Sequence, residues 1–197
     1  MKYLIKKVNE ILLSNPSAVI AVDGMCASGK TTFAKQLEDE LGFQVIHMDD
    51  FFLPPDMRTD ERLSMPGGNV HYERFFKEVS IPLKNGRDSE YRIFDCSVGN
   101  YTEKRKVVNG KPLVIEGAYS THPEIPDIYD LKIFFEISTE LQLERIENRN
   151  GVQALEIFKE KWIPLENRYF KTFSIKEKCD IAVEVKNEYS KINSCFD

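Results

Sequence analysis

The sequence has few cysteines and few histidines, and their spacing excludes the common metal-binding and redox motifs. Its 197 residues include three histidines and four cysteines, the latter at positions 26, 96, 179 and 195. No cysteine pair is spaced as C-x-x-C, and no Cys/His set has the spacing of a zinc site. We therefore expect free thiols in a reducing compartment.

The sequence also lacks an excess of positive charge and a long hydrophobic segment. The formal net charge is −5, and the one short basic cluster, residues 104–106, follows Glu103, so we interpret it as solvated surface. Residues 1–18 carry apolar side chains at helical spacing, without the continuous apolar core of a signal peptide. No apolar run is long enough to span a bilayer. These absences predict a cytoplasmic protein with no nucleic-acid and no membrane partner.

Short apolar runs rich in β-branched residues alternate with helical patterns along the chain. Strands are predicted at 18–22, 45–46, 113–117, 131–137 and 180–185, with two further strand-like pieces at 91–95 and 106–108. Helices are predicted up to residue 14 and around 33–41, 72–83, 141–148 and 154–162, and a long loop at 49–68. The alternation predicts one α/β domain over residues 1–197, a three-layer α/β/α sandwich around a mostly parallel sheet. Ligands are expected at the carboxyl ends of its strands.

The first long strand leads directly into a phosphate-binding motif. Residues 24–32, GMCASGKTT, match G-x-x-x-x-G-K-[ST] between a buried strand and a helix. The glycines let successive backbone N–H groups turn toward an anion, and the helix N-terminus adds positive charge. Lys30 can reach the β- and γ-phosphates of a nucleotide, and the Thr31 hydroxyl can bind Mg²⁺. The candidate nucleotide-binding residues of this loop are Gly24, Ala27, Ser28, Gly29, Lys30, Thr31 and Thr32.

Acidic residues follow two other predicted strands. Asp49 and Asp50 come after the strand at 45–46. Either could accept the proton of an attacking hydroxyl, and both could equally be turn or cap residues. Glu116 ends another strand beside the phosphate loop, where a carboxylate suits Mg²⁺ or its water shell, although a Glu at a strand end commonly faces solvent.

The helix predicted at 141–148 begins a segment that carries two arginines. Arg145 and Arg149 are four residues apart and share a helix face. Guanidinium groups suit the charge of phosphoryl oxygens in a transition state, but Glu144 and Glu147 make a salt-bridged surface helix an equal alternative. We expect the aromatic residues nearby to pack this helical region rather than to bind a base: Phe158, Trp162, Tyr169 and Phe170.

These motifs, in this order, resemble the uridine kinase and phosphoribulokinase family of P-loop kinases, which also includes nicotinamide riboside and pantothenate kinases. The resemblance spans about residues 19–183 and rests on GMCASGKTT, MDDFFLP, GGNVHYERF, YRIFDCS, VIEGAYSTHP, the arginine-bearing helix and KCDIAVE. It implies a kinase that uses ATP and Mg²⁺ to phosphorylate a primary hydroxyl. It further implies a core at 18–185, an acceptor-site insertion at 50–110 and a lid at 140–170, and it makes a homo-oligomer a reasonable expectation.

The resemblance also implies roles for single residues. Asp49 would be the catalytic carboxylate, Lys30 would act on the phosphates, and the metal would lie near Thr31, Glu116 and Asp49. Arg145 and Arg149 would belong to a lid over ATP. The acceptor pocket would be lined by Asp50, Phe52, His71, Phe94, Asp95 and Tyr119.

Two departures from the family pattern weaken uridine as the acceptor. His71 stands where uridine kinases carry an Asp that binds the ribose hydroxyls, and Gly99 and Asn100 stand where they carry a histidine. The motif DDFF, residues 49–52, is more similar to the one in nicotinamide riboside kinases than to the one in typical uridine kinases. Nicotinamide riboside, pantothenate and a sugar therefore stay open as acceptors.

A nucleotide-dependent switch is the alternative from another class of protein. A GTPase would need an N-K-x-D motif, and an ATPase motor would need a strand that ends in Asp-Glu. The sequence contains neither.

Overall fold

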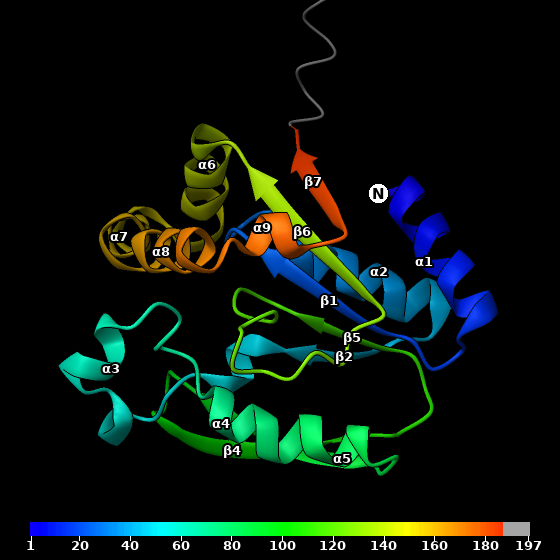
Figure 1. The fold of residues 1–197 in the computed structure, drawn as a ribbon. Coiled ribbons are helices and arrows are strands. Elements are labelled where there is room, and N and C mark those ends of the chain that lie inside the picture. Colours follow the sequence, from blue (N-terminus) through cyan, green and yellow to red (C-terminus); the bar gives the residue numbers. More distant parts are fainter. Residues whose placement is uncertain (187–197) are drawn as a thin grey trace, which may run out of the picture.

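A computed structural model describes residues 1–186, so the polar tail from residue 187, with Cys195, lies outside it. Its central element is a five-stranded sheet (Figure 1). The strands are β1 (Val19–Gly24), β2 (Gln44–His47), β5 (Leu113–Glu116), β6 (Leu131–Ile137) and β7 (Ile181–Val185). They stand in the order β2-β5-β1-β6-β7, and every neighbouring pair is parallel, as the sequence predicted. All five carboxyl ends therefore lie at one edge of the sheet, where α/β proteins bind ligands.

Helices cover one face of the sheet at the N-terminal end of the chain. α1 (Lys2–Ser14) and α2 (Lys30–Leu41) pack there, and Val8 and Phe33 join Ile20 and Val22 of β1 in one buried cluster. Figure 1 shows these two helices on the same side of β1. No helix within residues 1–186 is both long and apolar enough to cross a membrane.

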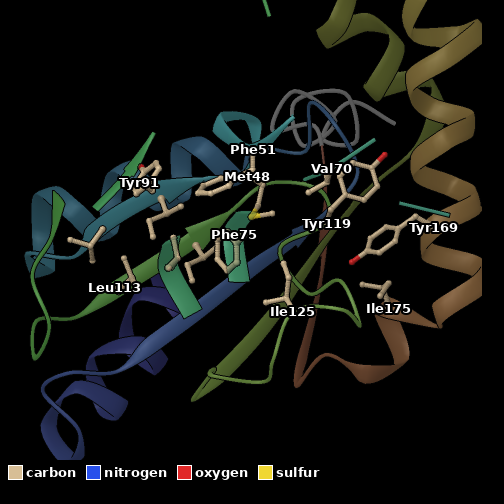
Figure 2. Close-up of a cluster of buried hydrophobic side chains, with 14 of the residues drawn as sticks. Met48, Phe51, Val70, Phe75, Tyr91, Leu113, Tyr119, Ile125, Tyr169 and Ile175 are labelled. Atoms are coloured by element: carbon tan, nitrogen blue, oxygen red, sulfur yellow. The ribbon is translucent and has the colours of Figure 1, made fainter. Parts of the chain in front are cut away.

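The other face of the sheet carries a second buried cluster (Figure 2). It is built by elements from the middle and the end of the chain: α4 (Tyr72–Phe75), α8 (Ile163–Phe173) and α9 (Ile175–Lys178). Phe75, Tyr169 and Ile175 pack there with Ile115 of β5. Because successive strand residues face opposite sides, Val114 belongs to the first cluster instead. The two clusters complete the three layers that the sequence predicted.

A two-stranded antiparallel hairpin lies outside this sheet. β3 (Ser89–Asp95) and β4 (Asn100–Val107) form it, and Tyr91 and Val107 face the cluster of Figure 2. Residues 49–68, directly after β2, were predicted as a long loop. This part of the chain contains two 3-10 turns and a short helix: η1 (Met48–Phe51), η2 (Pro55–Met57) and α3 (Asp60–Ser64). These short elements, a helical run over residues 72–84 and the hairpin follow one another in the connection between β2 and β5.

Two helical runs contain a proline, and one of these prolines explains the largest difference from the predicted helices; the helix predicted at 72–83 is confirmed as a run over 72–84. One helical run consists of α4, η3 (Phe76–Ser80) and α5 (Ile81–Lys84), and another follows α6 (Thr139–Asn150) as α7 (Val152–Ile157), η4 (Phe158–Trp162) and α8. In both runs a π-helical turn directly precedes an Ile-Pro-Leu sequence, with Pro82 or Pro164. Proline lacks an N–H and its ring meets the carbonyl of the preceding turn, so a wider turn lets the helix continue. The helix predicted at 154–162 stopped short of this proline, and α8 was missed.

Gly24 ends β1 at a point where the chain passes very close to β6. Its φ is +128°, and a Cβ atom at this position would overlap the carbonyl oxygen of Phe135. The close approach lets the Met25 N–H donate to that same oxygen at 2.9 Å. The backbone of the phosphate-binding loop is therefore fixed to the sheet at its first residue.

We predict that Gly24→Ala costs more than about 3 kcal/mol of stability, because it combines an unfavourable φ with a backbone clash. The matched control is Gly110→Ala: its φ is +80°, and nothing lies within 4 Å of an added Cβ. That control should cost about 1 kcal/mol. Urea unfolding of both variants measures the difference, and equal losses would contradict the close approach.

His122 is a buried histidine in an aromatic environment. Its ring stacks on Tyr72 and Tyr169, with ring centroids 4.7 and 5.7 Å away, and it is 3% exposed. Burial lowers its pKa from 6.5 to about 4. Between these two values the unfolded chain binds a proton that the folded protein does not, so the free energy of unfolding falls as the pH falls.

We predict that wild type loses about 2–3 kcal/mol more stability than His122→Phe as the pH is lowered from about 7 to about 4. Phenylalanine keeps the stacking but cannot titrate, and the contributions of all other groups cancel in the difference. Urea unfolding at a series of pH values measures it. Parallel stability curves would show that His122 is not buried in its neutral form.

Candidate functional site

The loop between β1 and α2 has the geometry of an anion cradle. Ala27 (φ +59°) and Gly29 (φ +96°) turn the backbone before α2 begins at Lys30. The buried Lys30 ammonium donates to the carbonyl oxygens of Gly24 and Met25, at 2.7 and 2.8 Å, so it spans the loop. A lysine beside the first free N–H groups of a helix is suited to bind phosphate.

Ser28 supports the same interpretation. Its hydroxyl is buried and has no hydrogen-bond partner in the part of the chain that the structure describes. Unpaired buried polar atoms are rare in folded proteins, and a water, ion or ligand that pairs with them is one explanation; Ser28 also lines the cavity described below. The loop therefore fits the phosphates of a nucleotide.

Thr31, Glu116 and His47 meet at the edge of the sheet beside this loop. The Thr31 hydroxyl donates to Glu116 Oε1 at 3.0 Å, and His47 Nδ1 lies 2.6 Å from the same oxygen. The hydrogen bond to Glu116 raises the pKa of His47. Carboxylate and hydroxyl oxygens are ligands that Mg²⁺ accepts, so the residues present fit this ion.

The protein alone does not form a complete metal cage there. Within residues 1–186, no group of three or more His, Cys, Asp and Glu side chains could hold a metal ion. Mg²⁺ usually keeps several waters and takes one or two carboxylates together with phosphate oxygens. A site with few protein ligands beside a phosphate cradle matches this usual coordination of Mg²⁺.

Asp49 follows β2 and faces the same space as the phosphate loop. Its side chain is exposed and lines the cavity described below. Desolvation by the surrounding protein atoms raises its pKa, the Glu116 carboxylate raises it further, and the Lys30 ammonium lowers it. A carboxylate with a raised pKa is a better proton acceptor, which suits a general base.

One cavity of about 960 Å³ joins these groups. The cavity follows the carboxyl edge of the sheet. It extends from residues after β2, past the phosphate loop, to residues 183–186 at the end of β7. Two aromatic residues expected only to pack the helical region, Phe158 and Trp162, also line it. The predicted site residues that line it are Ala27, Ser28, Gly29, Lys30, Thr31, Thr32, Asp49, Phe52, Glu116, Tyr119, Arg145 and Arg149.

Two of the predicted acceptor residues make contacts elsewhere. The Asp50 carboxylate accepts a hydrogen bond from the Tyr91 hydroxyl at 3.2 Å and lies 3.7 Å from Arg105, beside the hairpin. The side chain of His71 caps α4 by accepting the Arg74 N–H at 3.3 Å. Neither residue lines the cavity.

Phe94 and Asp95, also predicted for the acceptor pocket, belong to the β3–β4 hairpin. Phe94 is buried against Tyr101, with ring centroids 5.5 Å apart. Asp95 accepts the N–H and the hydroxyl of Ser97, at 2.7 and 2.6 Å, and so closes the turn between the strands. These two residues do not line the cavity either, whereas their neighbour Cys96 does.

Helices α6 and α8 bind the phosphate loop directly. The buried Glu166 carboxylate accepts the Cys26 N–H at 2.8 Å, and Gln142 donates to the Cys26 carbonyl oxygen at 3.1 Å. Arg145 donates to the Ala27 carbonyl oxygen at 3.2 Å. Burial raises the pKa of Glu166, which the Lys30 ammonium lowers in part. Sequence reasoning missed Glu166 and Gln142, because only the folded chain brings them to the loop.

Asp23 was also missed, although it directly precedes the phosphate motif. It is fully buried, and burial raises its pKa. Its carboxylate accepts the N–H of Gly24 (2.7 Å), the N–H and hydroxyl of Thr121 (3.0 and 2.7 Å), the N–H of Tyr119 (3.2 Å) and the hydroxyl of Tyr169 (2.9 Å). A charged residue within the buried run at 19–24 was the one available signal.

The chain matches a described protein family over more than half of its length. The model of the "Phosphoribulokinase / Uridine kinase family" matches residues 19–153. Over 164 residues the chain is 27% identical to the cytidylate kinase of Thermotoga maritima, covering 72% of this chain and 74% of that protein. Over 150 residues it is 26% identical to the uridine kinase of Limosilactobacillus reuteri, covering 68% and 66% of the two chains.

Solved structures share the fold. A structure from Bacillus stearothermophilus, described as a possible uridine kinase, superposes with a TM-score of 0.65 at 20% identity, covering 92% of this chain and 99% of that one. The D-glycerate 3-kinase of Cryptococcus neoformans superposes with a TM-score of 0.61 at 14% identity, covering 94% and 97%. At these identities the superpositions show the fold alone.

We predict that Asp23→Ala costs about 3–5 kcal/mol, because it leaves several buried donors unpaired. The matched control is Asp130→Ala, which removes an exposed carboxylate that accepts the Val19 N–H at the other end of β1. The control should cost about 1 kcal/mol or less. Urea unfolding measures both, and equal losses would show that the buried network adds nothing to stability.

Proposed function

Because the chain belongs to the phosphoribulokinase/uridine kinase family, we propose that it transfers the γ-phosphate of ATP to a primary hydroxyl of a nucleoside or a related metabolite. The observation that carries the proposal is the cavity that holds Asp49 and the Lys30 loop together. A phosphate cradle alone would suit any nucleotide-binding protein. A candidate base that faces the same space adds a place for an attacking hydroxyl.

We assign each residue a proposed part in this reaction. The loop from Gly24 to Thr32 binds the phosphates through its N–H groups, and Lys30 neutralises their charge. Asp49 orients the acceptor hydroxyl and takes its proton. A bond forms between the hydroxyl oxygen and the γ-phosphorus while the bond to the β–γ bridging oxygen breaks, so ADP leaves. Such in-line transfer depends mainly on positioning and on charge stabilisation.

Metal and lid residues complete the proposed site. Mg²⁺ supplies charge neutralisation at the β- and γ-phosphates when it is bound. Thr31 and Glu116 would hold it, with Asp49 close by, because their oxygens meet beside the loop. Arg145 and Arg149, which line the cavity from α6, would close over ATP with the proposed lid at 140–170 and exclude water.

The relatives leave several acceptors open. Their names include cytidylate kinase and uridine kinase, and the structural neighbours include a D-glycerate 3-kinase. Nicotinamide riboside, pantothenate and a sugar stay alternatives within the family. A nucleotide-dependent switch is the alternative from another class, and ATP hydrolysis that no acceptor stimulates would favour it.

We predict that Asp49→Asn lowers kcat by about 10²–10⁴-fold, because the amide cannot accept the proton of the hydroxyl. The affinity for ATP should change little, since Asp49 lies outside the phosphate loop. The assay is ADP release with ATP–Mg²⁺ and a panel of uridine, cytidine, nicotinamide riboside, pantothenate, glycerate and simple sugars.

The control for this variant is Asp88→Asn, which removes an exposed carboxylate paired with Lys106 on the hairpin. It should retain wild-type turnover. Normal turnover by Asp49→Asn with an accepted substrate would remove Asp49 from its role.

A further inference from the structure

The cavity that Asp49 lines also contains two buried polar side chains without partners. Asn69 is 6% exposed and Tyr119 is 3% exposed, and both line the cavity. In the described part of the chain, neither the nitrogen nor the oxygen of the Asn69 amide has a hydrogen-bond partner, and the Tyr119 hydroxyl has none. We call the part of the cavity lined by Asp49, Phe52, Asn69, Cys96, Tyr119, Trp162 and Glu166 the acceptor end.

The backbone holds Asn69 firmly in this position. Val70 pairs with Phe52 in an antiparallel bridge, and the Leu53 N–H donates to the Asn69 carbonyl oxygen at 3.2 Å. Gly68 passes so close to the chain that a Cβ atom would overlap the Arg62 carbonyl oxygen. Val70 is buried in the cluster of Figure 2, so its neighbour Asn69 is free to line the cavity. The unpaired amide is therefore a fixed feature and not a loose surface side chain.

Tyr119 is held in an unusual conformation beside it. Its φ is +76°, which is rare for a residue other than glycine, and its N–H donates to the buried Asp23 carboxylate. Backbone strain of this kind persists where the surroundings impose it, and it is common at ligand sites.

Asn69 and Glu166 are neighbours of the Tyr119 hydroxyl. Burial raises the pKa of Tyr119, the Glu166 carboxylate raises it further, and the Asn69 amide lowers it as a hydrogen-bonding neighbour would. The geometry of the Asn69 amide and the Tyr119 hydroxyl nevertheless falls short of a hydrogen bond. Both groups therefore keep their pairing capacity for a third partner.

The charges around the cavity restrict what that partner can be. Within residues 1–186, the cations that line the cavity are Lys30, Arg145, Arg149 and Lys186. Lys30 and Arg145 are bonded to carbonyl oxygens of the phosphate loop, Arg149 shares α6 with Arg145, and Lys186 follows β7 at the far side of the sheet. The acceptor end instead holds the carboxylates of Asp49 and Glu166. A second anionic group on the acceptor would lie among these carboxylates. The two cations nearest to them already donate to backbone oxygens: Lys30 to those of Gly24 and Met25, and Arg58, beside Cys96, to that of Leu53.

We propose that Asn69 and Tyr119 are specificity-determining residues that bind two adjacent hydroxyls of an uncharged, polyhydroxylated acceptor. The inference rests on the proposed kinase function and deepens it. An amide offers one donor group and one acceptor group, and a phenol offers both from one oxygen, which matches a pair of hydroxyls. The rings of Phe52 and Trp162, with centroids 5.8 Å apart, provide an apolar wall for the rest of the molecule.

The test uses acceptors that differ by one hydroxyl or by one charge. Kinase assays with wild type compare uridine with 2′-deoxyuridine, ribose with 2-deoxyribose, and both pairs with the anions glycerate, pantothenate and CMP. We expect at least one uncharged diol to be phosphorylated, with a KM that rises about 10- to 100-fold when one of its paired hydroxyls is removed. The anions should be poor acceptors.

The same assays on Asn69→Leu separate recognition from folding. We expect its acceptor KM to rise about 10- to 100-fold, while the KM for ATP stays within about threefold and the penalty for the deoxy analogue shrinks to about threefold. Tyr119→Phe, which removes a single oxygen, serves the same purpose if Asn69→Leu does not fold. The matched control is Ser80→Ala: Ser80 has a buried, unpaired hydroxyl that lies outside the cavity, so its removal should leave both KM values unchanged.

The outcomes distinguish this inference from the proposed function. Efficient phosphorylation of an anion, or an undiminished deoxy penalty in both Asn69→Leu and Tyr119→Phe, would overturn the inference and leave the kinase function intact. Stimulation of ADP release by no acceptor at all would overturn both.

Discussion

The buried carboxylate of Asp23 is the interaction on which the arrangement of the site depends. It binds the phosphate loop through the Gly24 N–H, the loop after β5 through Thr121, and helix α8 through Tyr169. A carboxylate in a dry interior is costly unless several donors satisfy it, so the three segments must assemble together. The cavity inherits its shape from that requirement, because each of the three segments contributes to its wall.

The phosphate loop is also connected to the two helices after β6. Glu166 of α8 accepts the Cys26 N–H, and Arg145 of α6 donates to the Ala27 carbonyl oxygen. An anion that competes for the Cys26 N–H has to displace the Glu166 carboxylate, and its charge attracts Lys30 and Arg145 at the same time. The phosphate loop and the helices α6 and α8 are thus held together by these few hydrogen bonds.

Local sequence predicted the parts of the fold that local chemistry decides. The buried strands, the phosphate motif and the parallel sheet follow from apolar runs and glycine spacing, and the structure confirms the sheet. Pro164 hid α8, because a π-helical turn before a proline leaves no signal in the periodicity. The sequence could not identify Asn69 and Glu166 as site residues for a different reason. Asn69 matters because its amide is unpaired in the cavity, and Glu166 because it accepts the Cys26 N–H, and both features depend on long-range packing.

Family membership and acceptor choice have separate physical origins in this chain. The phosphate loop, Asp49 and Glu116 stand at the ends of β1, β2 and β5, and the sheet that positions them is the feature shared with the superposed structures. Phe52 and Asn69 come instead from the segment between β2 and β5, and Tyr119 comes from a strained position after β5. The proposed phosphate chemistry thus depends on the first set of residues, and the proposed recognition of the acceptor on the second. The proposed choice of acceptor therefore rests on the polar groups and charges at the acceptor end, and not on the overall likeness.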